Sequence, residues 1–186
     1  MKLKPGQVLD EFEIEGHHIV FRTPKRGDEI GCMRHINRLV RDRVYIGRQT
    51  PVTLAEEKKW MRGLLRSQNA GEIVMVLVTV DGEIAGSAQV GLGRMRWNRH
   101  VAGLGIGLSR ARGMGIGTRL MKLMIRLARE HFREVRMIRL SAAGRNRVAL
   151  RLYRKAGFRE CGRIPGGFNW YGKYMDEVLM VRPLRR

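Results

Sequence analysis

Cysteine is scarce in this chain of 186 residues, which contains only Cys32 and Cys161, far apart in the sequence. So few cysteines exclude a disulfide framework and are typical of a protein from a reducing compartment. No apolar run is long enough to span a bilayer, and residues 1–6 lack the apolar stretch of a signal peptide. These absences predict a cytoplasmic protein without a membrane segment.

Acidic residues are also few. The chain has 17 Asp and Glu against 37 Lys and Arg, a formal net charge of +20, and 29 of the basic residues are arginine. Such a charge attracts polyanions through contacts that weaken with salt. Three interpretations stay open: contact with nucleic acid or ribosomes, an acidic substrate, or a compositional preference for arginine.

A metal site is not expected, because His17, His18, His35 and His131 do not have the spacing of metal ligands. With 44% hydrophobic residues the chain can bury a core without metals or disulfides, and its length fits one domain.

Apolar periodicity and turn residues predict alternating strands and helices. Strands are expected at 12–14, 18–21, 73–80, 84–90, 101–108, 135–140, 158–161 and 178–181. Helices are expected at 28–41, from Thr53 with a capping box at Glu56, at 117–132 and at 145–155. A hairpin followed by a β-α-β crossover indicates an α+β domain around a mixed sheet.

A glycine-rich segment at 104–121, LGIGLSRARGMGIGTRLM, joins an expected strand to an expected helix. Gly113, Gly115 and Gly117 allow the backbone to approach a ligand closely, and the amides at the helix start face an anion. Arg112 adds a guanidinium suited to phosphate. The segment lacks the Lys-Ser/Thr of a Walker A loop and the sixth-position glycine of a dinucleotide fingerprint. It therefore predicts a pyrophosphate site of another kind.

Two motifs in order give the chain a specific resemblance. Arg112, Gly115 and Gly117 match Arg/Gln-x-x-Gly-x-Gly/Ala, and residues 146–158 match Asn-x-x-Ala-x-x-Leu-Tyr-x-Lys-x-Gly-Phe. The chain resembles the GNAT N-acetyltransferase superfamily from residue 18 to its end, with 1–17 as an extension or extra strand. The resemblance implies a mixed, mostly antiparallel sheet with a splayed parallel strand pair and helices on both faces.

The resemblance also implies acetyl-CoA as co-substrate and a role for each matched residue. Tyr153 would protonate the leaving thiolate, a role that suits a phenol with a pKa near 10. Asn146 would fix the pantetheine arm, or cap a helix, or both. The expected contacts of acetyl-CoA are Ile106, Gly107 and Leu108 in the strand, Arg112, Gly113, Met114, Gly115, Ile116, Gly117 and Thr118 in the loop, and Asn146.

The general base is less well defined. Relatives with the pattern His-x-Ala-Glu-Leu-Gly offer a glutamate on this strand, but residues 100–105 here place Gly103 at that position. An alkylamine must lose a proton before it attacks, and a positioned base contributes roughly 10²–10⁴ in rate. The candidates are His100, Glu83 on the neighbouring strand, or a chain of waters.

The acceptor stays open between a small molecule, a lysine side chain and a protein N-terminus. Tyr171 and Tyr174 are candidates for the acceptor pocket, although they could equally cover the sheet edge. Like charges would repel a polycation, so the basic surface favours acidic or ribosomal targets. We predict direct acetyl transfer to a primary amine. The alternatives are a CoA-binding protein with weak or lost catalysis and a basic module associated with nucleic acid or ribosomes. A monomer and a homodimer are both compatible with the sequence.

Overall fold

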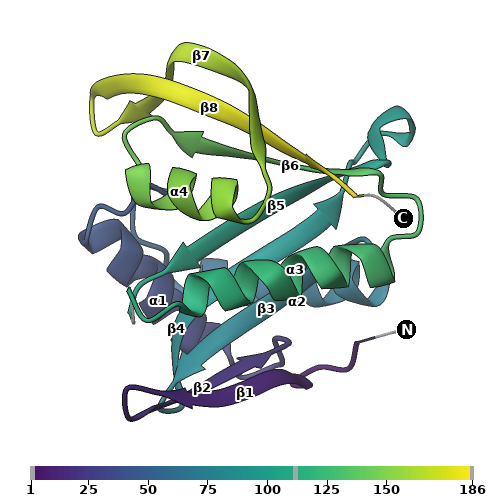
Figure 1. The fold of residues 1–186 in the computed structure, drawn as a ribbon. Helices are drawn as coiled ribbons and strands as arrows, with labels where there is room; N and C mark the ends of the chain where they lie inside the picture. Colours follow the sequence, from purple (N-terminus) through teal and green to yellow (C-terminus); the bar gives the residue numbers. More distant parts are fainter. Residues whose placement is uncertain (1–2, 111–112, 185–186) are drawn as a thin grey trace.

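The computed structural model describes residues 3–110 and 113–184, and one mixed sheet forms its centre (Figure 1). Its strands are β1 (Val8–Ile14), β2 (His17–Arg22), β3 (Ile73–Val80), β4 (Glu83–Leu92), β5 (Val101–Leu108), β6 (Met137–Ala143), β7 (Arg159–Trp170) and β8 (Lys173–Pro183). Its helices are α1 (Glu29–Arg41), α2 (Leu54–Asn69), α3 (Ile116–His131), α4 (Arg147–Lys155) and a short 3-10 turn, Arg96–Asn98. The strand order is β1-β2-β3-β4-β5-β6-β8-β7, and among the described strands only β5 and β6 pair in parallel.

The predicted fold class is confirmed, and several strands and helices begin at the residues predicted from the sequence. The β3 and β5 strands have the predicted bounds. Helix α2 begins after Thr53, whose hydroxyl accepts from the Glu56 amide at 3.3 Å, while the Glu56 carboxylate accepts from the Thr53 amide at 2.7 Å. This is the capping box that the sequence predicts.

The last two strands are much longer than the predicted segments 158–161 and 178–181. β7 and β8 pair from Arg159 to Trp170 and form a hairpin that turns at Tyr171 and Gly172. Most of β7 is exposed on both faces, so it lacks the alternation that marks a half-buried strand. The ladder shifts register between Ile164 and Phe168, which accommodates the intervening Pro-Gly-Gly as a bulge.

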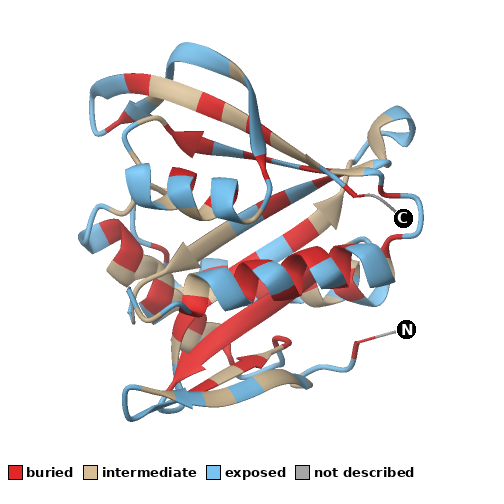
Figure 2. Ribbon diagram, viewed as in Figure 1, coloured by how far each residue is buried: buried red, intermediate tan, exposed pale blue. Residues whose placement is uncertain are grey.

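The two faces of the sheet carry different helices. Val74 and Val76 of β3 belong to a core that includes residues of α3 and α4, whereas Met75 and Leu77 pack with residues of α1 and α2. Successive strand residues point to opposite faces, so α3 and α4 cover one side and α1 and α2 the other. Figure 2 shows the buried residues along β3 and the sheet-facing side of α3. None of the described helices is both long and apolar enough to cross a bilayer.

The parallel pair β5–β6 is short and opens into a wedge. The two strands pair only at Val101 with Met137, Ala102 with Ile138, and Gly103 with Arg139. Beyond that point β5 stays with β4 as far as Leu108, and β6 stays with β8 as far as Ala143. The sheet therefore divides near its centre, and this division positions the candidate site.

Candidate active site

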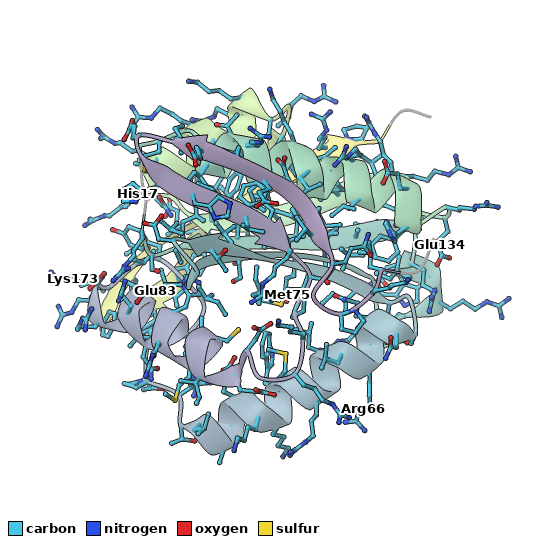
Figure 3. The ribbon with its side chains drawn as sticks, turned by 90° about the horizontal axis from the view of Figure 1, so that it is seen from below. His17, Arg66, Met75, Glu83, Glu134 and Lys173 are labelled. Atoms are coloured by element: carbon cyan, nitrogen blue, oxygen red, sulfur yellow. The ribbon has the colours of Figure 1, made fainter. Side chains whose placement is uncertain are left out.

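A cavity of about 610 Å³ lies where β5 and β6 diverge. Its wall includes Tyr153 and Leu104 from the core beneath α3 and α4, and Cys32 and Met75 from the opposite core beneath α1 and α2. Figure 3 shows Met75 in the space between the sheet and the α1–α2 layer. Residues from both faces of the sheet therefore contribute to its wall, at the point where the pairing of β5 with β6 ends.

The face of β5 toward α1 and α2 carries only glycine between residues 102 and 108. Ala102 and Leu104 belong to the core on the α3–α4 side, so the alternate residues Gly103, Gly105 and Gly107 face the other way. A Cβ at Gly105 would have only Gln89 Cγ nearby, at 4.0 Å. Gly105 and Gly107 line the cavity, and the absence of side chains on this face leaves room for it.

Tyr153 projects from α4 into the cavity wall. Its side chain is buried, at 6% exposure, and burial raises the pKa of its phenol to about 12. In the described part of the chain its hydroxyl has no hydrogen-bond partner, while its ring packs 6.1 Å from the ring of Phe158. The hydroxyl is therefore protonated at neutral pH and available as a donor inside the cavity.

Asn146 stands at the start of α4 and also lines the cavity. Its side-chain oxygen accepts from the Ala149 amide at 3.1 Å, as an N-cap residue does. The cap uses the oxygen only, so the side-chain amino group can still donate to a ligand.

The glycine-rich loop leads into α3 with two left-handed glycines. Gly113 has φ 93°, and Gly115, the N-cap of α3, has φ 75°. The Thr118 amide donates to the Gly115 carbonyl at 3.0 Å, whereas the amides of Ile116 and Gly117 have no acceptor in the described residues. Free amides at a helix start form an anion site. Arg112, the predicted phosphate ligand, lies outside the described residues.

Sequence comparison identifies the family of this site. The profile described as Acetyltransferase (GNAT) family matches residues 37–158, well over half of the chain. The chain belongs to the GNAT acetyltransferase family. This result confirms the resemblance that the two motifs indicated.

Named relatives and a solved structure agree with this assignment. The GNAT chain is 28% identical over 151 residues to YwnH of Bacillus subtilis, a proposed phosphinothricin acetyltransferase, covering 80% of this chain and 88% of the relative. It is 25% identical over 158 residues to the L-methionine sulfoximine/L-methionine sulfone acetyltransferase of Pseudomonas paraeruginosa, covering 81% and 86%. The fold matches yncA of Salmonella typhimurium, solved with its cofactor acetyl-CoA, with a TM-score of 0.76 at 19% identity over 90% of this chain and 95% of that one.

Neither predicted base of this GNAT protein reaches the cavity. His100 lies just before β5, at the end opposite the glycine-rich loop, and its carbonyl accepts from the Arg136 amide at 2.8 Å. Glu83 begins β4 with a side chain 65% exposed, and its carboxylate pairs with Arg110 at 2.5 Å. Figure 3 shows Glu83 away from Met75. The structure therefore does not bring either residue to Tyr153.

The two tyrosines predicted for the acceptor pocket also lie outside the cavity wall. The Tyr171 hydroxyl lies 3.2 Å from the carbonyl oxygens of both Val40 and Gln49 and can donate to either, which links the β7–β8 hairpin to the end of α1 and the segment after it. Tyr174 is 72% exposed. From the same aromatic stretch it is Phe168 that lines the cavity.

Two cavity residues on α1 and α2 were missed because no local motif marks them. His35 is buried beside Ser109, with 2.9 Å between its Nδ1 and the serine hydroxyl, and that hydroxyl donates to the Ala85 carbonyl at 3.0 Å. Burial lowers the pKa of His35 to about 4, so its ring is neutral. Glu57 is 5% exposed, and burial raises the pKa of its carboxyl, an effect that nearby Arg48 opposes.

Basic side chains of α3 border a second groove on the α3–α4 side, of about 540 Å³. Lys122, Arg126 and Arg129 line it together with Lys155 and Arg182, against the single acid Glu130 among the described lining residues. The idea that this surface contacts polyanions stays a prediction. In the described residues no cluster of three or more potential metal ligands is found.

Proposed function

We propose that this GNAT protein transfers the acetyl group of acetyl-CoA directly to a primary amine. The observation that supports this most strongly is the cavity through the wedge, with Tyr153 in its wall. A cavity whose wall includes residues from both faces of the sheet can hold two substrates next to each other, as a ternary complex requires.

The chain has the features that a CoA thioester needs. From Leu104 to Gly107 the edge of β5 has no paired strand from β6, so the backbone there can pair with the amide groups of a pantetheine arm. The amides of Ile116 and Gly117 at the start of α3 suit the pyrophosphate. When bound, acetyl-CoA supplies an acetyl group activated as a thioester, whose carbon–sulfur bond is exchanged for a carbon–nitrogen bond as the electron pair leaves on sulfur.

We assign Tyr153 as the general acid that protonates the departing sulfur. Its phenol with a pKa of about 12 keeps its proton until negative charge develops nearby and then donates it or shares it in a hydrogen bond. The acceptor amine, once neutral, loses one further proton to water as the amide forms, and the Tyr153 phenolate regains from water the proton that it gave to sulfur, so the transfer is balanced in protons.

The cysteines support direct transfer rather than an acetyl-cysteine intermediate. Cys32 lines the cavity, but burial raises the pKa of its thiol to about 12, which keeps it protonated and weakly nucleophilic. Cys161 is exposed on β7 and lies outside the cavity wall.

Thiol release from acetyl-CoA in the presence of an amine panel tests the proposal, with mass spectrometry of the acetylated product. We expect amine-dependent turnover that survives Cys32→Ala and Cys161→Ala. Binding of acetyl-CoA without turnover on any amine would instead favour a CoA-binding protein that has lost catalysis.

Replacing Gly115 with alanine is expected to weaken acetyl-CoA binding about tenfold. A Cβ at φ 75° costs roughly 1–2 kcal/mol, and relief of that strain turns the loop amides away from the pyrophosphate. Isothermal titration calorimetry with acetyl-CoA measures the effect. Gly16→Ala is the matched control, because Gly16 has φ 77° in the β1–β2 turn, far from the loop. Equal losses of affinity in both variants would contradict the assignment of the loop.

A further inference from the structure

The cavity carries a charge opposite to that of the protein around it. The whole chain has a formal charge of +20. Among the described residues that line the cavity, however, three are carboxylates, Glu56, Glu57 and Glu177, and only Arg48 is basic. The acidic lining is the opposite of what the net charge of the chain would predict. This contrast indicates that the carboxylates in the cavity interact with a ligand.

Glu57 is the only one of these three carboxylates that is buried. Glu56, its neighbour on α2, closes the capping box with Thr53 and approaches Arg48 at 3.4 Å. The Glu57 carboxylate has no hydrogen bond or ion pair in the described residues, although the side chain is only 5% exposed. Glu57 lines the cavity and receives only the longer-range attraction of Arg48, so a cationic group in the cavity would give its carboxylate a direct partner.

Aromatic side chains surround the same region. Trp60 lies three residues after Glu57 on α2 and lines the cavity, as do Tyr45 and Phe168. Residues three apart on a helix share a face, so the Glu57 carboxylate and the Trp60 indole are neighbours. Aromatic faces attract ammonium groups, so carboxylate and rings favour the same kind of ligand.

The glycine face of β5 leaves space for that ligand. Gly105 and Gly107 line the cavity without side chains, and Gly103, where the family pattern has glutamate, supplies no carboxylate. The acidic group on the α1–α2 side of the sheet therefore comes from α2 rather than from β5. Arg48 is the one lining cation in the described chain, and it already approaches Glu56, so an anionic acceptor lacks a free counter-charge.

We propose, building on the proposed function, that the acceptor is an amine with a second cationic group, and that Glu57 binds this second charge. This class includes diamines, polyamines and peptides with a basic residue near the reacting amine. It differs from the expectation of acidic or ribosomal acceptors, which was based on the net charge and stays a prediction. It also differs from the amino-acid analogues that appear in the names of the two sequence relatives.

Three acceptors with the same five-carbon chain test the proposal: cadaverine, the matching amino alcohol and the matching amino acid. Thiol release gives kcat/KM for each. We expect the wild-type protein to prefer cadaverine over the amino alcohol by about tenfold or more, and the amino acid to be the poorest acceptor.

Glu57→Gln keeps the shape of the side chain and removes its charge. We expect this variant to lose most of the preference for cadaverine, because its kcat/KM falls much more for cadaverine than for the amino alcohol. Glu72→Gln is the matched control, because Glu72 is exposed after α2 and does not line the cavity. Acetyl-CoA binding, measured by calorimetry, reports whether Glu57→Gln is folded.

Each other outcome overturns the proposal. If the amino acid is acetylated as well as cadaverine, the cavity does not select positive charge. If Glu57→Gln lowers kcat/KM equally for all three acceptors, Glu57 acts on the reacting nitrogen and not on the second charge. Turnover without charge preference would overturn this inference alone, whereas no turnover on any amine would overturn the proposed function as well.

Discussion

Tyr153→Phe is expected to lower kcat by roughly a hundredfold or more. The substitution removes one hydroxyl from a buried ring and leaves the packing against Phe158 in place. Loss of a positioned acid typically reduces a rate by roughly 10²–10⁴. Steady-state thiol release from acetyl-CoA gives kcat, and calorimetry should show an almost unchanged affinity for acetyl-CoA because the loop and β5 are untouched.

Tyr174→Phe is the control for this loss. It removes the same atom from a side chain that is 72% exposed and outside the cavity wall, so we expect wild-type turnover. If the Tyr153→Phe variant is as active as wild type, Tyr153 is not the general acid, and water protonates the departing sulfur instead. Burial raises the pKa of the Tyr153 phenol to about 12. Deprotonation of Tyr153 should therefore not lower the wild-type rate at any pH below that value.

Gly105→Val is expected to abolish most of the acetyl transfer while the protein stays folded. Valine suits a strand better than glycine, and the new Cβ would meet only Gln89 Cγ at 4.0 Å, an ordinary contact. Its methyl groups would nevertheless enter the cavity. Displacement of reacting groups by about 1 Å can cost roughly a hundredfold in rate, so we expect at least that loss.

Gly103→Val is the control that distinguishes loss of activity by blocking of the cavity from loss of activity by damage to strand β5. It places the same side chain on the same face of β5, two residues earlier, where the added Cβ is free of contacts and the cavity wall does not extend. Thermal unfolding and thiol release of both variants make the comparison. Equal activity in the two would show that the glycine face of β5 does not border the reaction space.

The sequence predicted those parts of the fold and site that depend on local signals. The run at 73–80, the capping box at Thr53 and the glycine-rich loop each depend on a few neighbouring residues, and each is found where predicted. Tyr153 and Asn146 were named from a motif within one helix, and the structure places both in the cavity wall. Both were assigned through the family resemblance that this motif carries, and the motif itself lies within a short stretch of sequence.

The acceptor side could not be predicted in the same way because it is assembled from distant segments. Glu57 reaches the cavity through the packing of α2 on β3, and Glu177 through its place on β8 beside β6. Neither lies in a motif. One signal was present in the sequence: the alternation of Gly103, Gly105 and Gly107 indicates a strand face without side chains.

The wedge between β5 and β6 affects how firmly the two halves of the sheet are held together. The strands β1–β5 and the strands β6–β8 are joined as a sheet by three residue pairs, so the hydrogen-bonded ladder has a seam at its centre. A ligand arm seated along β5 would extend the ladder and resist separation of the two halves. Any co-substrate that binds only the folded protein adds about 2.7 kcal/mol of stability at a concentration 100 times its Kd. Amide hydrogen exchange where β5 meets β6 would then be slowest at high acetyl-CoA concentration. The two halves of the sheet would therefore separate least often when the co-substrate is bound.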